Sequence, residues 1–314
     1  MTLFKKLNNH IGWLVFLIAS FVYLSTIEQT VSFWDCGEYI ATAYKLEVGH
    51  PPGAPFFQLF GRIFSLFATQ GTSEVAVAVN ILSALCSSFT ILFLFWTITA
   101  FGKKMIFKSN VKLELGQIIA VLGSGLVGAL AYTFSDSFWF SAVEGEVYAM
   151  SSLFTAVTFW CIMKWEEEAD KPQASRWLVL IAYLIGLSVG VHLLSLLTIP
   201  AMGMIYYFKK YSYTKSGAIK AFIISMTILG IVQAVIIPGA VSLISKFELF
   251  FVNTVGLPFN YGTIIYFLTI IAIIVYGLIY TKKNNKTIWN TAILSVMMLL
   301  IGYSSFAILV VRSN

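Results

Sequence analysis

Nine long apolar runs occupy most of this sequence and restrict what it can fold into. A chain needs about 20 mostly apolar residues to cross a hydrocarbon core of about 30 Å. Such runs lie approximately at 11–27, 75–101, 116–134, 147–163, 177–191, 193–208, 218–240, 263–281 and 288–311. They lack the alternating pattern of barrel strands, so helices must satisfy the backbone in lipid. The sequence therefore predicts an all-α polytopic membrane protein with about nine transmembrane helices.

Composition supports this fold class. The chain is 59% hydrophobic and only 11% charged, whereas soluble domains carry about 25% charged residues. The apolar stretch from Trp177 to Phe208 is too long for one span, so we expect a break near Val191 and His192. The spans contain essentially no charged residue and only a few polar ones such as Asn80 and Gln233, which disfavours a proton- or ion-coupled transporter.

The charges indicate an orientation. Under the nine-span arrangement, Lys5, Lys6, Lys209, Lys210 and the segment 103–112 fall on one side of the membrane, and most acidic residues fall on the other. The positive-inside rule then places the N-terminus in the cytoplasm and the C-terminus outside. The net charge of +6 reflects this topology, so no nucleic-acid partner is expected. No disulfide framework is indicated by the three scattered cysteines, Cys36, Cys86 and Cys161.

We interpret residues 1–314 as one transmembrane domain with three outer loops, at 28–74, 135–146 and 241–262. The first loop is predicted to hold two juxtamembrane helices. Residues 37–48 have helical spacing, and 54–68 (APFFQLFGRIFSLFA) form an amphipathic pattern. They are joined by Gly49-His50-Pro51-Pro52-Gly53, in which the prolines favour an extended turn.

Candidate site residues concentrate in this loop. Asp35 is either a functional carboxylate close to lipid or the N-cap of the helix over 37–48. Glu38, three residues later, is either its partner or a second capping residue. His50 is either an anion ligand or a turn residue, and Arg62 either an anion ligand or a snorkelling interfacial residue.

The other outer segments add further polar groups. The second loop places Glu144 and Glu146 beside Trp139 and Tyr148, which suits sugar recognition but also fits an acidic loop with interfacial aromatic anchors. His192 lies at the outer turn between two short spans and is either a ligand or a packing residue. The sequence GSGLVG (123–128) lies inside an apolar run, where helix packing through small residues explains it. The charge run KWEEEADK (164–171) is interpreted as a solvated loop.

Three stretches carry a resemblance to a known family. The sequences FWDCGEYIATAYKLEVGHPPGAPFFQLFGR, SAVEGEVYAM and GLSVGVHLLSLL resemble the family catalogued as domain of unknown function 2723. That family is similar to the protein O-mannosyltransferases of the GT-C superfamily of membrane glycosyltransferases. Two departures are evident. Asp35 and Glu38 are three residues apart where O-mannosyltransferases usually have adjacent Asp-Glu. Family members also commonly continue into a large soluble region, which we expect this sequence, ending at Asn314, not to include.

The resemblance implies an inverting glycosyltransferase that moves a mannose-like sugar from a polyprenyl-phosphate donor to a Ser/Thr hydroxyl of an exported protein. Asp35 would be the general base, assisted by Glu38. The donor phosphate would be bound by His50, Arg62, His192 and Lys45. The sugar or acceptor would be bound by Trp34, Glu144, Glu146 and Tyr148.

The resemblance also bears on location and partners. The site would face the periplasm of a bacterial inner membrane. We expect no cofactor besides the lipid-linked donor and no divalent metal, because Asp35-x-x-Glu38 alone is weak evidence for a metal site. No oligomeric state is predicted. The alternative function is a non-catalytic lipid-binding, transport or partner subunit.

Overall fold

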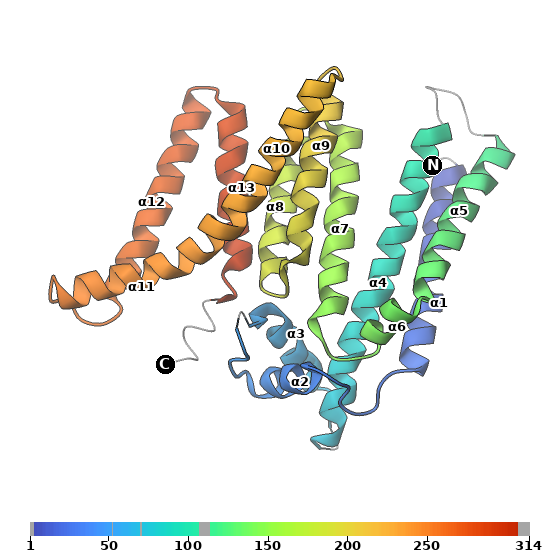
Figure 1. Cartoon of the computed structure of the whole chain (residues 1–314), viewed down its shortest axis with the longest axis horizontal. Coiled ribbons are helices and arrows are strands. Elements are labelled where there is room, and N and C mark those ends of the chain that lie inside the picture. Colours follow the sequence, from blue (N-terminus) through green and yellow to red (C-terminus); the bar gives the residue numbers. More distant parts are fainter. Residues whose placement is uncertain (1–2, 52, 70, 107–113, 307–314) are drawn as a thin grey trace. The chain divides into compact units, whose positions relative to one another are not determined.

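The computed structural model describes residues 3–51, 53–69, 71–106 and 114–306, and within them every regular element is helical. In the N-terminal part of Figure 1, α1, α4 and α5 lie alongside one another, and the short helices α2 (Cys36–Lys45) and α3 (Pro55–Ser65) lie near one end of α4. The main N-terminal helices are α1 (Leu3–Ser25), α4 (Ser73–Ile106), α5 (Leu115–Thr133) and α7 (Val147–Glu168). The predicted all-α polytopic membrane fold is confirmed.

Six helices among the described residues are long and apolar enough to cross a membrane. They are α1, α4, α5, α7, the continuous helix Lys215–Asn253, and α12 (Tyr261–Lys283). Each of the nine apolar runs contains a helix, but three of these helices are shorter: α8 (Ser175–Val189), α9 (Thr198–Lys210) and α13 (Thr287–Tyr303). The count of nine spans therefore stays a prediction.

The break expected inside 177–208 is present. Helix α8 ends at Val189, a 3-10 turn covers Leu193–Leu197, and α9 runs over Thr198–Lys210. The two helices predicted in the first loop also form, at 36–45 rather than 37–48 and at 55–65 rather than 54–68. Helix α2 stops early because Leu46 adopts a left-handed conformation, with φ 54°.

The segment 241–262, expected as a loop, differs from that prediction. Helix α10 (Lys215–Ile231) continues through a π-helical turn into α11 (Ile237–Asn253). Glu248 then accepts hydrogen bonds from the backbone N–H groups of Asn260 and Thr263 at the start of α12. Residues 107–113 of the expected basic loop and residues 307–311 of the last expected span lie outside the described residues.

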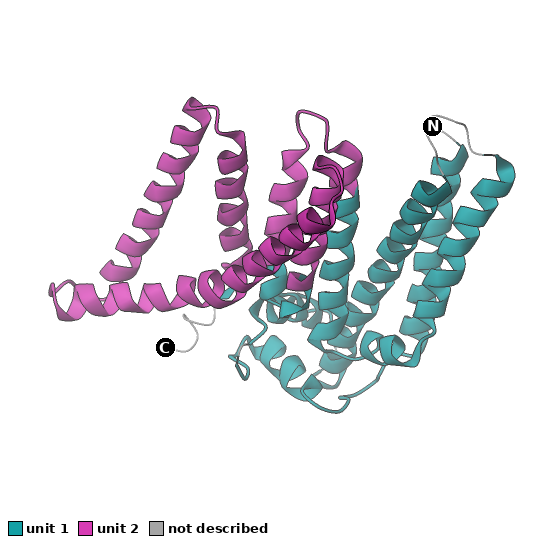
Figure 2. Cartoon of the chain, turned by 45° about the horizontal axis from the view of Figure 1, so that its top comes forward, with its two compact units in different colours: residues 1–163, 187–195, 305–314 teal, residues 164–186, 196–304 magenta. Residues whose placement is uncertain are grey.

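The chain divides into two compact units, shown in Figure 2. The first consists of residues 1–163, 187–195 and 305–314. Its α4 is apolar around its whole circumference and packs against α1, α3 and α5. Gly125 permits close packing of α5 on α4, since a Cβ atom there would lie 2.5 Å from the side chain of Thr99. This supports the interpretation of GSGLVG as a packing element.

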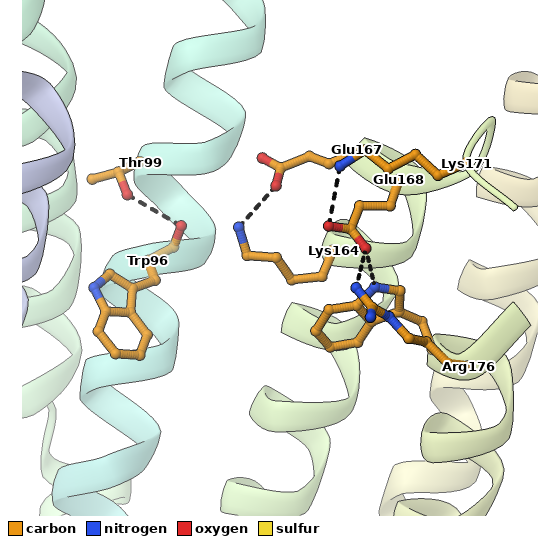
Figure 3. A network of polar contacts seen from close by, with 8 residues as sticks. Trp96, Thr99, Lys164, Glu167, Glu168, Lys171 and Arg176 are labelled. Atoms are coloured by element: carbon orange, nitrogen blue, oxygen red, sulfur yellow. Dashed lines mark hydrogen bonds and ion pairs between the residues drawn. The ribbon is translucent and has the colours of Figure 1, made fainter. Parts of the chain in front are cut away.

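The second unit consists of residues 164–186 and 196–304. The charge run at its start is not merely solvated. Glu168 accepts hydrogen bonds from Arg176 and from the indole of Trp177, both at 2.8 Å, and pairs with Lys171 at 3.3 Å (Figure 3). The run therefore ties the end of α7 to the start of α8.

Candidate functional site

The candidate site forms in the first unit, around the start of α2. Asp35 occupies the N-cap position, but its side chain makes no capping hydrogen bond and its backbone is already helical, with φ −80° and ψ −2°. The side chain is 54% exposed. A capping carboxylate would be turned onto the helix N–H groups, so the Asp35 carboxylate remains available to a ligand.

Glu38 and His50 form the polar pair closest to Asp35. Glu38 accepts hydrogen bonds from the backbone N–H of His50 and from its ring, with 2.9 Å between His50 Nδ1 and Glu38 Oε2. The other ring nitrogen, Nε2, lies 3.9 Å from Asp35 Oδ2. These bonds lower the pKa of Glu38, and the Glu38 carboxylate, with a smaller contribution from Asp35, raises the pKa of His50. Both carboxylates thus favour the protonated form of His50.

Glycine at position 49 makes the pairing possible. A Cβ atom there would lie 3.1 Å from Glu38 Oε1, so a larger residue would crowd the carboxylate. The loop then turns, with the Gly53 N–H donating to the carbonyl of His50 at 2.8 Å. The histidine is therefore both a turn residue and a member of the cluster.

The second loop places two buried carboxylates beside this cluster. Glu144 and Glu146 are 5% and 8% exposed. Burial raises the pKa of both, and with added repulsion from Glu144 and Asp35 the pKa of Glu146 rises to about 7. Within the described residues neither forms a salt bridge, and Glu144 Oε2 has no hydrogen-bond partner. A side-chain hydrogen bond with Ser32 lowers the pKa of Glu144, but burial outweighs it, so the neutral carboxylic acid is favoured at both positions.

Aromatic residues connect the segments. Burial raises the pKa of Tyr39 to about 12, with smaller contributions from the negative charges of Glu146, Asp35 and Glu38. Its ring lies 6.0 Å from that of His50. The rings of Tyr148 and His192 meet edge-on at 5.4 Å. Residues from three distant segments therefore lie close together, and the binding roles expected for Glu144, Glu146, Tyr148 and His192 stay predictions.

Residues 35–215 match the family model described as the protein O-mannosyl-transferase TMEM260 N-terminal domain. That is more than half of the chain, and it contains the whole cluster from Asp35 to His192. The chain belongs to this family.

Two curated relatives agree with the match. The chain is 28% identical to protein O-mannosyl-transferase tmem260 of Dictyostelium discoideum over 197 residues, which are 60% of this chain. It is 25% identical to protein O-mannosyl-transferase TMEM260 of Mus musculus over 175 residues, which are 56% of this chain. Each alignment spans 22% of the relative's length. No solved structure matches the chain.

Not every residue expected in the site of this TMEM260-family chain joins the cluster. Arg62 donates to the backbone carbonyl of Tyr44 at 2.8 Å, with its guanidinium 5.3 Å from the Tyr44 ring centre. Tyr44 is nine residues beyond Asp35, roughly 14 Å along α2. Arg62 therefore ties α3 to the C-terminal end of α2, away from Asp35. Lys45 pairs with Glu47 at 3.9 Å at that same end.

Trp34 is the most exposed of the expected sugar ligands. Its side chain is 92% exposed and its backbone is left-handed, with φ 60°, an uncommon conformation for a bulky residue. Trp34 contributes no packing to the cluster but directly precedes Asp35.

Asn80 is a site residue that the sequence did not single out. It is fully buried, and its amide donates to the carbonyls of Glu28 at 2.7 Å and Thr30 at 3.2 Å. A Cβ atom on Gly145 would lie 2.7 Å from Asn80 Oδ1. Asn80 thus fixes the first outer loop beside the second. The one available signal was an asparagine inside an apolar run.

Among the described residues of this TMEM260-family chain, one group of side chains could bind a metal ion. Asp35, Glu38 and His50 each offer an atom within 4.8 Å of the others. In the structure His50 Nδ1 is hydrogen-bonded to Glu38, so a cation would have to displace a proton from the His50 ring to bind there. The group as it stands is an ion-pair network.

Proposed function

We propose that this chain carries the catalytic site of a membrane protein O-mannosyltransferase, which transfers mannose from a polyprenyl-phosphate donor to a Ser or Thr hydroxyl of an exported protein. The names of both relatives support the reaction class. The observation that carries the site assignment is the Asp35 carboxylate, which does not cap its own helix and lies beside a histidine held by Glu38.

In the proposed reaction the acceptor oxygen attacks C1 of the sugar. The bond between C1 and the phosphate oxygen breaks, polyprenyl phosphate leaves with the bonding electrons, and the configuration at C1 inverts. Asp35 takes the hydroxyl proton as general base, a role that typically contributes about 10²–10⁴-fold to rate. The atoms balance without a metal or a redox cofactor.

The remaining residues have separate roles in this proposal. His50, when protonated, stabilises the negative charge that develops on the departing phosphate. Glu38 orients His50 through two hydrogen bonds. Tyr148 and Glu146 offer an aromatic surface and hydrogen bonds to the sugar, and His192 packs edge-on against the Tyr148 ring. Arg62 positions α2 rather than the phosphate.

A transfer assay tests the proposal. Purified protein is incubated with polyprenyl-phosphate mannose and a Ser/Thr peptide, with and without a chelator, and the peptide is analysed by mass spectrometry. The proposal expects a mass increase of one hexose that is insensitive to chelation. Donor binding without transfer would instead favour a non-catalytic lipid-binding subunit. If the protein neither binds the donor nor transfers mannose, polyprenyl-phosphate mannose is not its donor.

A further inference from the structure

A groove lies within the second unit between α8, α9 and α10. Its volume is about 610 Å³, within the range of about 300–1,000 Å³ typical of small-molecule sites. Its lining includes Leu178 and Ile181 on α8, Met202 on α9, and Ala221 and Ile224 on α10. All residues that line it belong to the second unit, so the groove shares none with the candidate site in the first unit.

Two glycines bring α9 and α10 into direct contact along the groove. A Cβ atom on Gly203 would overlap the side chain of Ser225, and one on Gly217 would overlap the hydroxyl of Tyr207. The two helices therefore pack backbone to side chain at both points. The apolar residues beside this contact line the groove together with the facing residues of α8.

The groove offers mainly carbon surface. The Ser225 hydroxyl donates to the carbonyl of Ala221 at 2.6 Å, and the Tyr207 hydroxyl accepts from the backbone N–H of Thr214 at 2.9 Å, so these polar atoms already have partners within the chain. A hydrocarbon chain fits such a lining better than a sugar or a peptide does.

The length of the groove matches one leaflet of a bilayer. On α10 the lining extends from Gly217 to Ile228, which is eleven residues or roughly 16 Å. The hydrocarbon core of a bilayer is about 30 Å thick, so this is about half of it. A chain that enters from one membrane surface would fill the groove before it reached the other leaflet.

One end of the groove carries a positive charge. Among the described residues that line it, Lys220 alone is charged, and none of the described carboxylates pairs with it. By contrast, Lys209 and Lys210 at the end of α9 both pair with Asp170, at 3.1 and 2.9 Å. Tyr211 lines the same end and is 61% exposed, as is usual for aromatic residues at a membrane surface. The predicted orientation places this end at the cytoplasmic face.

We propose that this groove binds an acyl chain of an anionic glycerophospholipid, with the lipid phosphate at Lys220. The carbon lining suits the chain, the length suits a single leaflet, and the lysine suits the phosphate. Basic pockets between helices on the cytoplasmic side are typical sites for anionic headgroups. In the predicted orientation the groove opens on the face opposite Asp35, so its ligand is a membrane phospholipid rather than a sugar donor. The inference goes beyond the proposed function and does not depend on it.

The test separates the headgroup from the chain. Native mass spectrometry of the purified chain in non-ionic detergent measures its affinity for phosphatidylglycerol and for phosphatidylcholine with the same acyl chains. Lys220→Gln removes the charge, and its control is Lys215→Gln, at an exposed position of α10 outside the lining.

Two further variants fill the groove. Ala221→Trp places an indole in it, and Ile224→Trp, at a lining position that is 59% exposed, does so at a surface site in case Ala221→Trp fails to fold. Their control is Ile223→Trp, at a neighbouring position that is 56% exposed and lies outside the lining.

Wild type should prefer phosphatidylglycerol by about five-fold, the contribution of one lysine near an anionic lipid. Lys220→Gln should lose that preference and Lys215→Gln should keep it. The groove-filling variants should bind both lipids about ten-fold or more weakly, the equivalent of about two excluded methylene groups, and Ile223→Trp should bind them like wild type.

Three results would overturn the inference. The first is equal affinity of wild type for the two lipids, and the second is an equal loss of preference in Lys220→Gln and Lys215→Gln, which would indicate general attraction to a basic surface. The third is wild-type affinity of the folded groove-filling variants. Each result leaves the proposed function intact, because mannose transfer is not part of the measurement.

Discussion

His50 Nδ1 lies 2.9 Å from Glu38 Oε2, and the two residues are twelve positions apart. This pair closes the loop between α2 and α3 and points the other ring nitrogen toward Asp35. The loop geometry and the charge of His50 therefore depend on one glutamate.

Replacing that glutamate should change the titration of His50. In Glu38→Gln the hydrogen bond and charge that raise the pKa of His50 are lost, so its pKa should fall toward the ordinary value of about 6.5. NMR titration of the histidine ring signals measures this. Glu47→Gln, which removes a more distant carboxylate paired with Lys45, is the control. An unchanged His50 titration in Glu38→Gln would show that the pair does not persist in solution.

Glu146 should make the protein less stable as pH rises. Its pKa is raised to about 7 in the folded state by burial and by neighbouring carboxylates, so between about pH 4.5 and 7 the folded protein binds more protons than the unfolded chain. Stability from this group is therefore present at low pH and lost as pH rises through 7. The full effect is on the order of 2–3 kcal/mol.

Thermal unfolding between pH 5 and 8 tests this sign. Glu146→Gln should gain in melting temperature relative to wild type as pH increases, whereas Glu47→Gln should track wild type at every pH. A constant difference between Glu146→Gln and wild type across the range would mean that the carboxyl group is not titrating there.

Arg62 is expected to act on stability rather than on donor binding. Arg62→Ala removes the hydrogen bond to the Tyr44 carbonyl and the contact with its ring, which should cost about 1–2 kcal/mol. Affinity for polyprenyl phosphate should stay near wild type. If Arg62→Ala lost this affinity without a change in melting temperature, the result would show that Arg62 binds the phosphate.

Cysteine labelling can establish the orientation. Native Cys36, Cys86 and Cys161 are all buried, so Cys36 is a poor reporter and an introduced cysteine should dominate labelling. A membrane-impermeant thiol reagent applied to intact cells should modify Glu47→Cys but not Lys171→Cys, both at exposed positions. Labelling of Lys171→Cys but not of Glu47→Cys would show that the orientation is opposite to the predicted one.

Local patterns predicted the helices and the site segments better than they predicted contacts. Apolar run length places the spans, and helical spacing in Gly37–Val48 places α2 within a few residues. The partners of Arg62 and the role of Asn80 depend on atoms 18 and about 50 residues away, which spacing does not encode. Likewise, α11 continues past the expected boundary because its apolar helical pattern persists to Asn253.

Replacement of Asp35 tests the central claim most directly. Asparagine preserves the shape of aspartate and serves as well as an N-cap, but it cannot accept the acceptor's proton. Asp35→Asn should therefore keep wild-type melting temperature and polyprenyl-phosphate affinity while mannose transfer to the peptide falls by about 10²–10⁴-fold. Wild-type transfer by the folded Asn variant would contradict the assignment of Asp35 as the general base.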